Sequence, residues 1–150
     1  MPEKVTMERA REDAREGKSP STQAGEFVRE EIDHIREGKH GARSTKQAIA
    51  IGLSKARRAG VKLPPPGKGK TSSRTGAQAE RDYEKGQTGG GRRKPSARRS
   101  RATSNALKRE GHAAASPKSL SRQATASAAR RGSAARHRSA RKAARTRTGH

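Results

Sequence analysis

Lysine and arginine side chains are the residues of this sequence with the clearest chemistry. They form short clusters and one long run after residue 90, spaced by Ala, Ser and Gly. Small neighbours let a polyanion approach closely, and an arginine guanidinium forks onto two phosphate oxygens while displacing condensed counterions. We therefore predict nucleic-acid contacts from fourteen cations: Arg92, Arg93, Lys94, Arg98, Arg99, Arg101, Arg130, Arg131, Arg136, Arg138, Arg141, Lys142, Arg145 and Arg147.

A smaller group of cations closes a predicted helix nearer the amino terminus. This helix starts at Ser44 with Gln47 three residues later, which is the pattern of a capping box, and Gly60 ends it. Capping is the favoured interpretation of Ser44 and Gln47; the alternative is a helix whose amino-terminal side chains contact base edges. We add the cations of its last turns to the predicted interface: Lys55, Arg57 and Arg58.

Other chemistry has little support in the residue pattern. The chain has no cysteine, and His34 and His40 are six residues apart across a predicted helix stop at Gly38, which is not the i,i+4 spacing of a helical metal site. The Gly- and Lys-rich segment at 67–72 lacks the spacing of a phosphate-binding loop, and no nucleophile is followed by a base at a recognisable distance. We expect no enzyme, no cofactor and no metal.

Composition points to a polyanionic partner. The 150 residues carry 37 Lys and Arg against 14 Asp and Glu, for a net charge of +23, while 27% are hydrophobic and 1% aromatic. RNA readers stack bases on aromatic side chains, and the aromatic residues of this chain are Phe27 and Tyr83 alone. We therefore favour duplex DNA as the partner and keep RNA as the second option. No apolar run reaches the ~20 residues of a membrane span, and no secretory signal is evident. We expect a cytoplasmic protein at the nucleoid, with no membrane partner.

Charge divides the chain into regions. Residues 1–63 hold 14 Lys and Arg against 10 Asp and Glu, whereas residues 64–150 hold 23 against 4. A proline run followed by Gly and Lys separates the two halves at 63–70. We predict a small three-helix module at 1–63, a Pro/Gly-rich linker with one short helix at 64–95, and an Arg/Ala/Ser-rich basic tail at 96–150.

Helical spacing of apolar residues defines the elements of the module. We predict helices at about 4–15, from 19–21 to 36, and from 44 to 59, the second and third forming a helix-turn-helix-like pair. Phe27, Ile32 and Ile35 should pack against Ile49 and Leu53, with Val61 a further candidate. A core of this size is marginal, so we expect possible self-association through the 24–53 helical pair.

Three arginine-glutamate-glycine triplets, at 15–17, 36–38 and 109–111, each precede a serine-led segment. They are interpreted either as a reused helical hairpin or as ordinary helix-stop chemistry. After the linker we predict a short helix at 77–85 and three alanine- and arginine-rich segments at 96–109, 116–131 and 133–147. Their local preference is helical, but dense positive charge and few apolar residues predict disorder in the free tail and helix on a polyanion. The fold class is all-α.

Two stretches resemble a known family: SPSTQAGEFVREEI at 19–32 and REGKHGARSTKQAIAIGLSKARRAGV at 36–61. They resemble small basic bacterial proteins classed as a domain of unknown function, closely over most of residues 1–65 and loosely in the tail. Some such proteins carry a generic DNA-binding label, and the family supplies no activity or site residues. The tail is similar in composition to bacterial histone-like and linker-histone-like tails, including Ser116-Pro117-Lys118.

These observations lead to one expected function and two alternatives. We expect non-specific DNA binding by a nucleoid-associated, histone-like protein that contacts the phosphate backbone. The first alternative is a transcriptional regulator that reads sequence with the 44–58 helix. The second is an accessory protein that binds RNA or the ribosome.

Overall fold

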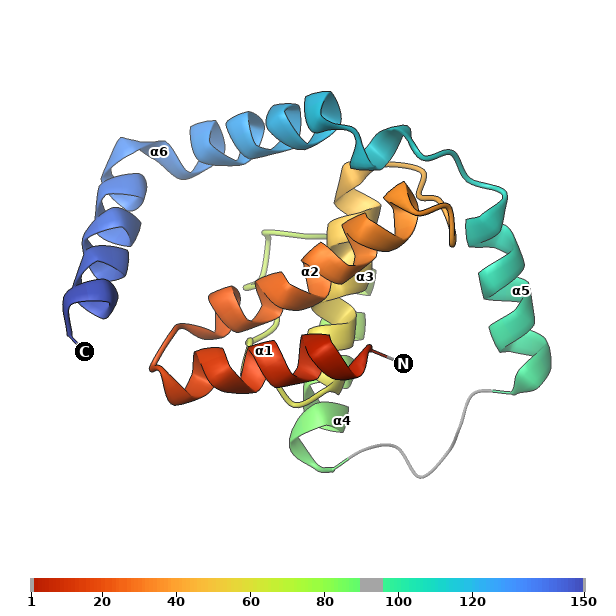
Figure 1. The fold of residues 1–150 in the computed structure, drawn as a ribbon, viewed down its shortest axis with the longest axis horizontal. Helices are drawn as coiled ribbons and strands as arrows, with labels where there is room; N and C mark the ends of the chain where they lie inside the picture. The colour runs from red at the N-terminus through yellow and green to blue at the C-terminus, as the bar shows by residue number, and fades with distance from the viewer. Residues whose placement is uncertain (1, 90–95, 150) are drawn as a thin grey trace.

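The computed structural model describes residues 2–89 and 96–149, and these are helical with no strand (Figure 1). The all-α prediction is therefore confirmed. Within the described residues, no helix is long and apolar enough to cross a membrane. The elements in chain order are α1 (Lys4–Arg15), α2 (Pro20–Arg36), α3 (Thr45–Arg58), α4 (Ser73–Gln87), α5 (Ala97–Lys108), the 3₁₀ turn η1 (Ala113–Ala115) and α6 (Pro117–Thr148).

Serine caps begin α2 and α3, and a left-handed glycine follows each of the first three helices, as predicted; α1 begins after Glu3 without a side-chain cap. The Ser19 hydroxyl accepts from the Thr22 amide at the start of α2. At both Gly17 and Gly38 the backbone is left-handed, with φ of 75° and 78°, which ends the preceding helix without a Cβ clash. The third triplet differs, since Gly111 is not left-handed and its carbonyl instead accepts from a backbone amide of the α2–α3 loop.

Glycines also set how closely the helices cross. A Cβ on Gly52 of α3 would lie 2.6 Å from the Val28 Cα of α2, so the two backbones are in direct contact. A Cβ on Gly86 of α4 would lie 1.8 Å from the Arg57 carbonyl oxygen of α3. The predicted helix at 77–85 is therefore longer than expected, because Ser72 caps it earlier and Gly86 packs on α3 instead of ending it.

The core consists of two apolar clusters on either side of the α2–α3 crossing. In the first, Phe27 packs with Ala56 and Val61 and with the half-buried Leu53, in agreement with the prediction. In the second, Ile32 and Ile35 do not pack on Ile49 as predicted, because smaller residues cover them. These residues are Ala42, Ala48, Ala114 and Ala115, with Val28 and Leu120 at the edge.

The second cluster shows that the start of the tail docks on the module. The Thr45 hydroxyl donates to the Ala114 carbonyl at 2.7 Å, and Arg36 Nε donates to the Ala115 carbonyl at 3.0 Å. The amides of Gly41 and Ala42 bond to backbone carbonyls at 107 and 111, at 2.9 and 3.0 Å. Much of the apolar face predicted to drive self-association is thus covered within the chain.

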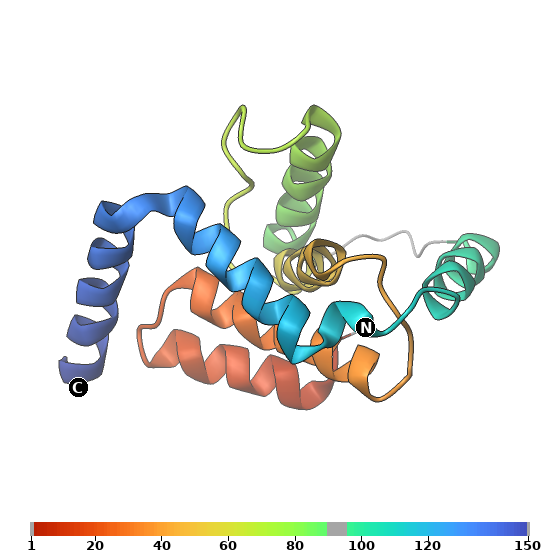
Figure 2. The ribbon, with the colours of Figure 1, turned by 90° about the horizontal axis from the view of Figure 1, so that it is seen from above.

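The prediction of a disordered free tail is wrong, because α5 and α6 are helices in the isolated chain. Alanine and arginine are strong helix formers, and the hydroxyls of Ser96 and Ser116 cap the two helix starts. Gly132, at φ 76° and ψ 167°, interrupts α6, so its two halves match the predicted segments at 116–131 and 133–147. Figure 2 shows the resulting bend.

Candidate nucleic-acid interface

The second half of α6 gathers four cations on one side. Arg138, Arg141, Lys142 and Arg145 follow the i, i+3, i+4, i+7 spacing of a single helix face, and together they line one surface groove. At 1.5 Å rise per residue this α6 cationic face is about 10 Å long. Duplex DNA carries roughly six phosphate charges over that length. The four side chains can therefore lie along one stretch of a phosphate backbone.

The surroundings of α6 leave its cations available. The helix holds ten Lys and Arg and no Asp or Glu, and none of its residues is buried. Among the described residues, no ion pair joins a Lys or Arg of α5 or α6 to a carboxylate. Its first half contacts η1 and α3, and its far end lies beside the α1–α2 turn. The charge is held in place without being neutralised.

Not all of the other predicted tail cations in the described residues lie with this face. Those of α5 are exposed, yet α5 lies on the opposite side of the molecule from the second half of α6 in both views (Figures 1 and 2). Arg136 donates to the Ala128 carbonyl at 2.9 Å and so spans the break at Gly132. The predicted cations of α5 are Arg98, Arg99 and Arg101. Three predicted cations of α6 are also exposed: Arg130, Arg131 and Arg147. The remaining three lie outside the described residues: Arg92, Arg93 and Lys94.

The cations at the end of α3 differ in their exposure. Lys55 pairs with the buried carboxylate of Glu31. Arg57 is 7% exposed and donates to two backbone carbonyls at the start of the proline run. Burial lowers the pKa of the Arg57 guanidinium, and the nearby Asp82 carboxylate opposes this shift. Arg58 is exposed, with Nε 3.9 Å from Asp82. Lys55 and Arg57 hold the helical body together, and we leave them out of the proposed interface.

Polar side chains at the start of α3 already form hydrogen bonds within the chain. Ser44 Oγ accepts from the Gln47 amide at 3.1 Å, and Gln47 Oε1 accepts from the Arg43 amide at 2.6 Å. Thr45 is buried beneath η1, which leaves Lys46 as the exposed polar side chain of the first turn. Ser44 caps α3 as predicted, while the Gln47 side chain bonds one residue before the cap, at Arg43, and not at Ser44 as in a capping box. The geometry favours capping over contact with bases.

Docking of the tail also creates a second basic surface. Arg43 and Lys46 at the start of α3 and Arg122 of α6 line a shared cleft. Sequence reasoning did not single out these cations, because they are far apart in the chain and come together only when Ala114 and Ala115 pack on α2 and α3. No local pattern could have identified this basic cleft.

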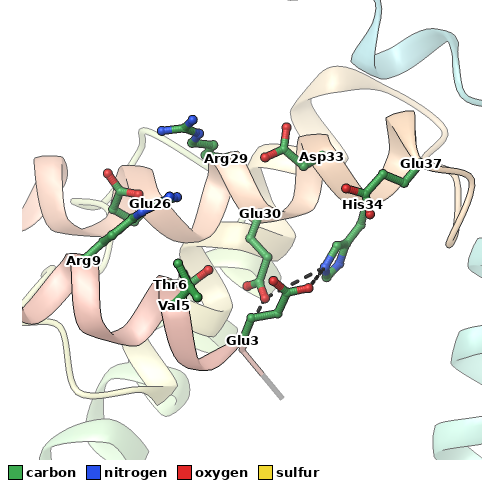
Figure 3. A pocket seen from close by; sticks show the side chains of 10 residues that line it. All are labelled: Glu3, Val5, Thr6, Arg9, Glu26, Arg29, Glu30, Asp33, His34 and Glu37. Atoms are coloured by element: carbon green, nitrogen blue, oxygen red, sulfur yellow. Dashed lines mark hydrogen bonds and ion pairs between the residues drawn. The ribbon is translucent and has the colours of Figure 1, made fainter.

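Carboxylates and histidines form a cluster near the second half of α2, of which Figure 3 shows Glu3, Glu30 and His34. His34 Nε2 is 2.9 Å from Glu3 Oε1, and His40 Nε2 is 3.0 Å from Glu31 Oε2. The two imidazole rings meet edge to face, with centroids 6.0 Å apart. The six-residue spacing is not that of a helical metal site, and the two rings meet because the turn at Gly38 folds the chain back.

The described helices and cations define an all-α protein in which a small helical body carries a basic helical arm. A family model described as a family of unknown function (DUF6496) matches residues 17–68. The match includes α2, α3 and the loop between them and ends in the proline-glycine segment, so the chain is similar to this family in its central helical pair. No curated protein and no solved structure matches the chain significantly.

Proposed function

We propose that the protein binds duplex DNA without sequence preference, through phosphate contacts made mainly by the α6 cationic face, and acts as a nucleoid-associated, histone-like protein. The observation that carries the proposal is α6 itself: ten Lys and Arg, no acidic residue, and no ion pair to a carboxylate in the described part of the chain. Cations in this state retain their full capacity to displace condensed counterions from DNA.

The aromatic residues support a duplex over single-stranded nucleic acid. Phe27 is fully buried in the core, and Tyr83 is half-buried on α4. Proteins that bind single strands stack bases mainly on exposed Phe, Tyr and Trp rings, and the described residues offer no fully exposed ring of these three types. Contacts to the backbone of a duplex need only charge and close approach, which the Ala- and Ser-spaced cations of α6 provide.

The hydrogen bonds of Ser44 and Gln47 support binding without base readout. In helix-turn-helix proteins the first residues of the second helix contact base edges, and here those side chains cap α3 while Thr45 lies under η1. The basic cleft of Arg43, Lys46 and Arg122 adds cations beside this capped turn. Such cations position a phosphate backbone and carry no sequence information directly.

The test is equilibrium binding of the full chain to three ligands at matched salt: a 30-base-pair duplex, a duplex of scrambled sequence, and a structured RNA. We expect equal affinity for the two duplexes, weaker binding to the RNA, and an affinity that falls steeply with salt. A preference of tenfold or more for one duplex would indicate sequence reading. Tighter binding to the RNA would indicate an RNA- or ribosome-associated role. Either result would overturn the proposal.

A further inference from the structure

We propose that Glu3, Glu30 and His34 form a binding site for one divalent transition-metal ion, with Zn²⁺ the best match. The three side chains come from the residue that precedes α1 and from the second half of α2, and their ligand atoms lie within 4.8 Å of one another. Figure 3 shows the Glu3 and Glu30 carboxylates and the His34 imidazole turned toward a common point. This site is independent of the proposed DNA interface.

The spacing of the ligand atoms suits a small ion. His34 Nε2 is 2.9 Å from Glu3 Oε1 and 3.9 Å from Glu30 Oε1. A tetrahedral zinc ion with bonds of about 2.1 Å to nitrogen and oxygen separates its ligands by roughly 3.4 Å. The two observed distances lie on either side of this value, so shifts of about half an ångström would bring His34 Nε2 and each carboxylate oxygen to the separation that a bound zinc ion requires.

The state of Glu30 is the independent observation that points to a cation. Its side chain is 2% exposed, and Oε2 is buried with no hydrogen-bond partner among the described residues. The other oxygen accepts from the Glu3 amide at 2.6 Å. Buried carboxylates are ordinarily paired or bound to metal, and the ion pair that Glu30 makes is a long one, from Oε1 to His34 Nε2 at 3.9 Å. A metal ion held by both side chains would satisfy the carboxylate more closely than this contact does.

The site has space and suitable donors. A cavity of about 80 Å³ is bordered by Glu3, Glu30 and His34 together with Thr6, which is room for an ion and its bound water. One imidazole and two carboxylates form a donor set that zinc accepts, with a fourth position left for water. Three ligands and one water would resemble the open arrangement of many zinc sites.

The neighbouring cations do not block this site. Lys39 Nζ lies 3.4 Å from Glu3 Oε1, but Lys39 is exposed and also bonds to Glu37 at 3.1 Å, so it can turn away. Both oxygens of the adjacent Glu31 carboxylate already have partners, because one pairs with Lys55 and the other with His40. For this reason we assign the ion to Glu3 and Glu30 in preference to the Glu31–His40 side of the cluster.

The test measures Zn²⁺ binding to the full chain after removal of metal, by isothermal titration calorimetry and by the melting temperature in the presence and absence of Zn²⁺. The substitutions are Glu3→Gln and His34→Gln, which remove ligands at the rim of the site and leave the buried Glu30 in place. The matched control is Glu26→Gln, which removes the same charge from the border of the same cavity but lies outside the ligand cluster.

We expect one equivalent of Zn²⁺ to bind the unmodified chain and Glu26→Gln equally, and to raise both melting temperatures. Each ligand substitution should weaken binding at least tenfold and abolish the rise. The proposal is overturned if no equivalent binds at millimolar Zn²⁺, or if both ligand variants bind as well as the control. Loss of binding with His34→Gln but not with Glu3→Gln would place the ion on Glu31 and His40 and also overturn it.

Discussion

Replacing Arg138, Arg141, Lys142 and Arg145 together by glutamine removes the α6 cationic face while leaving the helix. All four side chains are exposed and none forms an ion pair with a carboxylate in the described structure. Glutamine has nearly the helix propensity of lysine and arginine, so α6 should remain helical. The variant therefore tests the charge of this face separately from its fold.

The expected effect follows from counterion release. Each phosphate contact contributes about −0.9 to the slope of log K against log salt, so losing four contacts should make the slope shallower by roughly 3.6. Raising salt from about 50 to 200 mM changes log salt by about 0.6. The fold by which affinity falls over this range should therefore be roughly 150 times smaller for the variant than for the unmodified chain. At about 50 mM salt the variant should bind DNA more weakly than the unmodified chain. The difference between their affinities should narrow as salt rises.

The matched control removes four exposed cations from α1: Lys4, Arg9, Arg11 and Arg15, each replaced by glutamine. It has the same net charge as the face variant, on a helix that also carries acidic residues. Fluorescence anisotropy with a labelled duplex at four salt concentrations gives both slopes, and circular dichroism checks that helix content is retained. We expect the control to change the slope by less than one.

Two results would refute the reasoning. If the face variant kept the slope of the unmodified chain, the contacts would lie elsewhere. If the face variant and the α1 control lost slope equally, net charge alone would govern binding, and the position of the cations on α6 would have no role.

Four further predictions concern the fold. Gly52→Ala should lower the free energy of unfolding by about 1–3 kcal/mol in chemical denaturation, because its Cβ would meet Val28 Cα at 2.6 Å. Gly25→Ala, with no atom within 4 Å, should raise it by up to about 1 kcal/mol. Hydrogen bonds from His34 and then Lys39 lower the pKa of Glu3. Ionised Glu3 therefore stabilises the fold above the ordinary glutamate pKa, and this stabilisation is lost as the pH falls. Glu3→Gln should flatten the fall in melting temperature between about pH 5 and 3. Gly132→Ala should straighten α6, because alanine disfavours the left-handed backbone there, and should lengthen the distance between spin labels at its ends.

Local features of the fold were predictable because they depend on neighbouring residues alone. Ser19, Ser44, Ser96 and Ser116 each begin a helix, since a serine hydroxyl satisfies an amide that the first turn leaves free. The apolar residues of the buried face of α2 followed from helical spacing, whereas the burial of Glu30 and Glu31 did not. The interruption of α6 at residue 132 also fell between two predicted segments, and that glycine adopts a backbone that few other residues tolerate.

The tertiary contacts could not be predicted, because no periodicity encodes them. Ala114 and Ala115 look like any alanines of a low-complexity tail, yet they complete the cluster around Ile35. The bonds that hold them run from Thr45 and Arg36 to backbone carbonyls, and backbone acceptors leave no trace in the sequence. The basic cleft and the pairing of His34 with His40 were missed for the same reason.

The prediction of disorder was wrong because overall composition was given more weight than local preference. High net charge and low hydrophobicity limit the core a chain can bury, but they do not prevent an alanine- and arginine-rich segment from forming a capped helix. The backbone bonds near Gly41 and Ala42 also fasten the start of the tail to the module, so α6 begins from a fixed point.

A preformed α6 changes the thermodynamics of any complex it enters. Freezing the backbone of one residue costs about 1–2 kcal/mol in conformational entropy at room temperature, and a coil that folded on its ligand would lose this amount at every residue it ordered. A helix that is already formed and fastened at Leu120 loses much less. Its complexes should therefore form without a coupled folding step, at rates governed by electrostatic steering and with a small heat-capacity change.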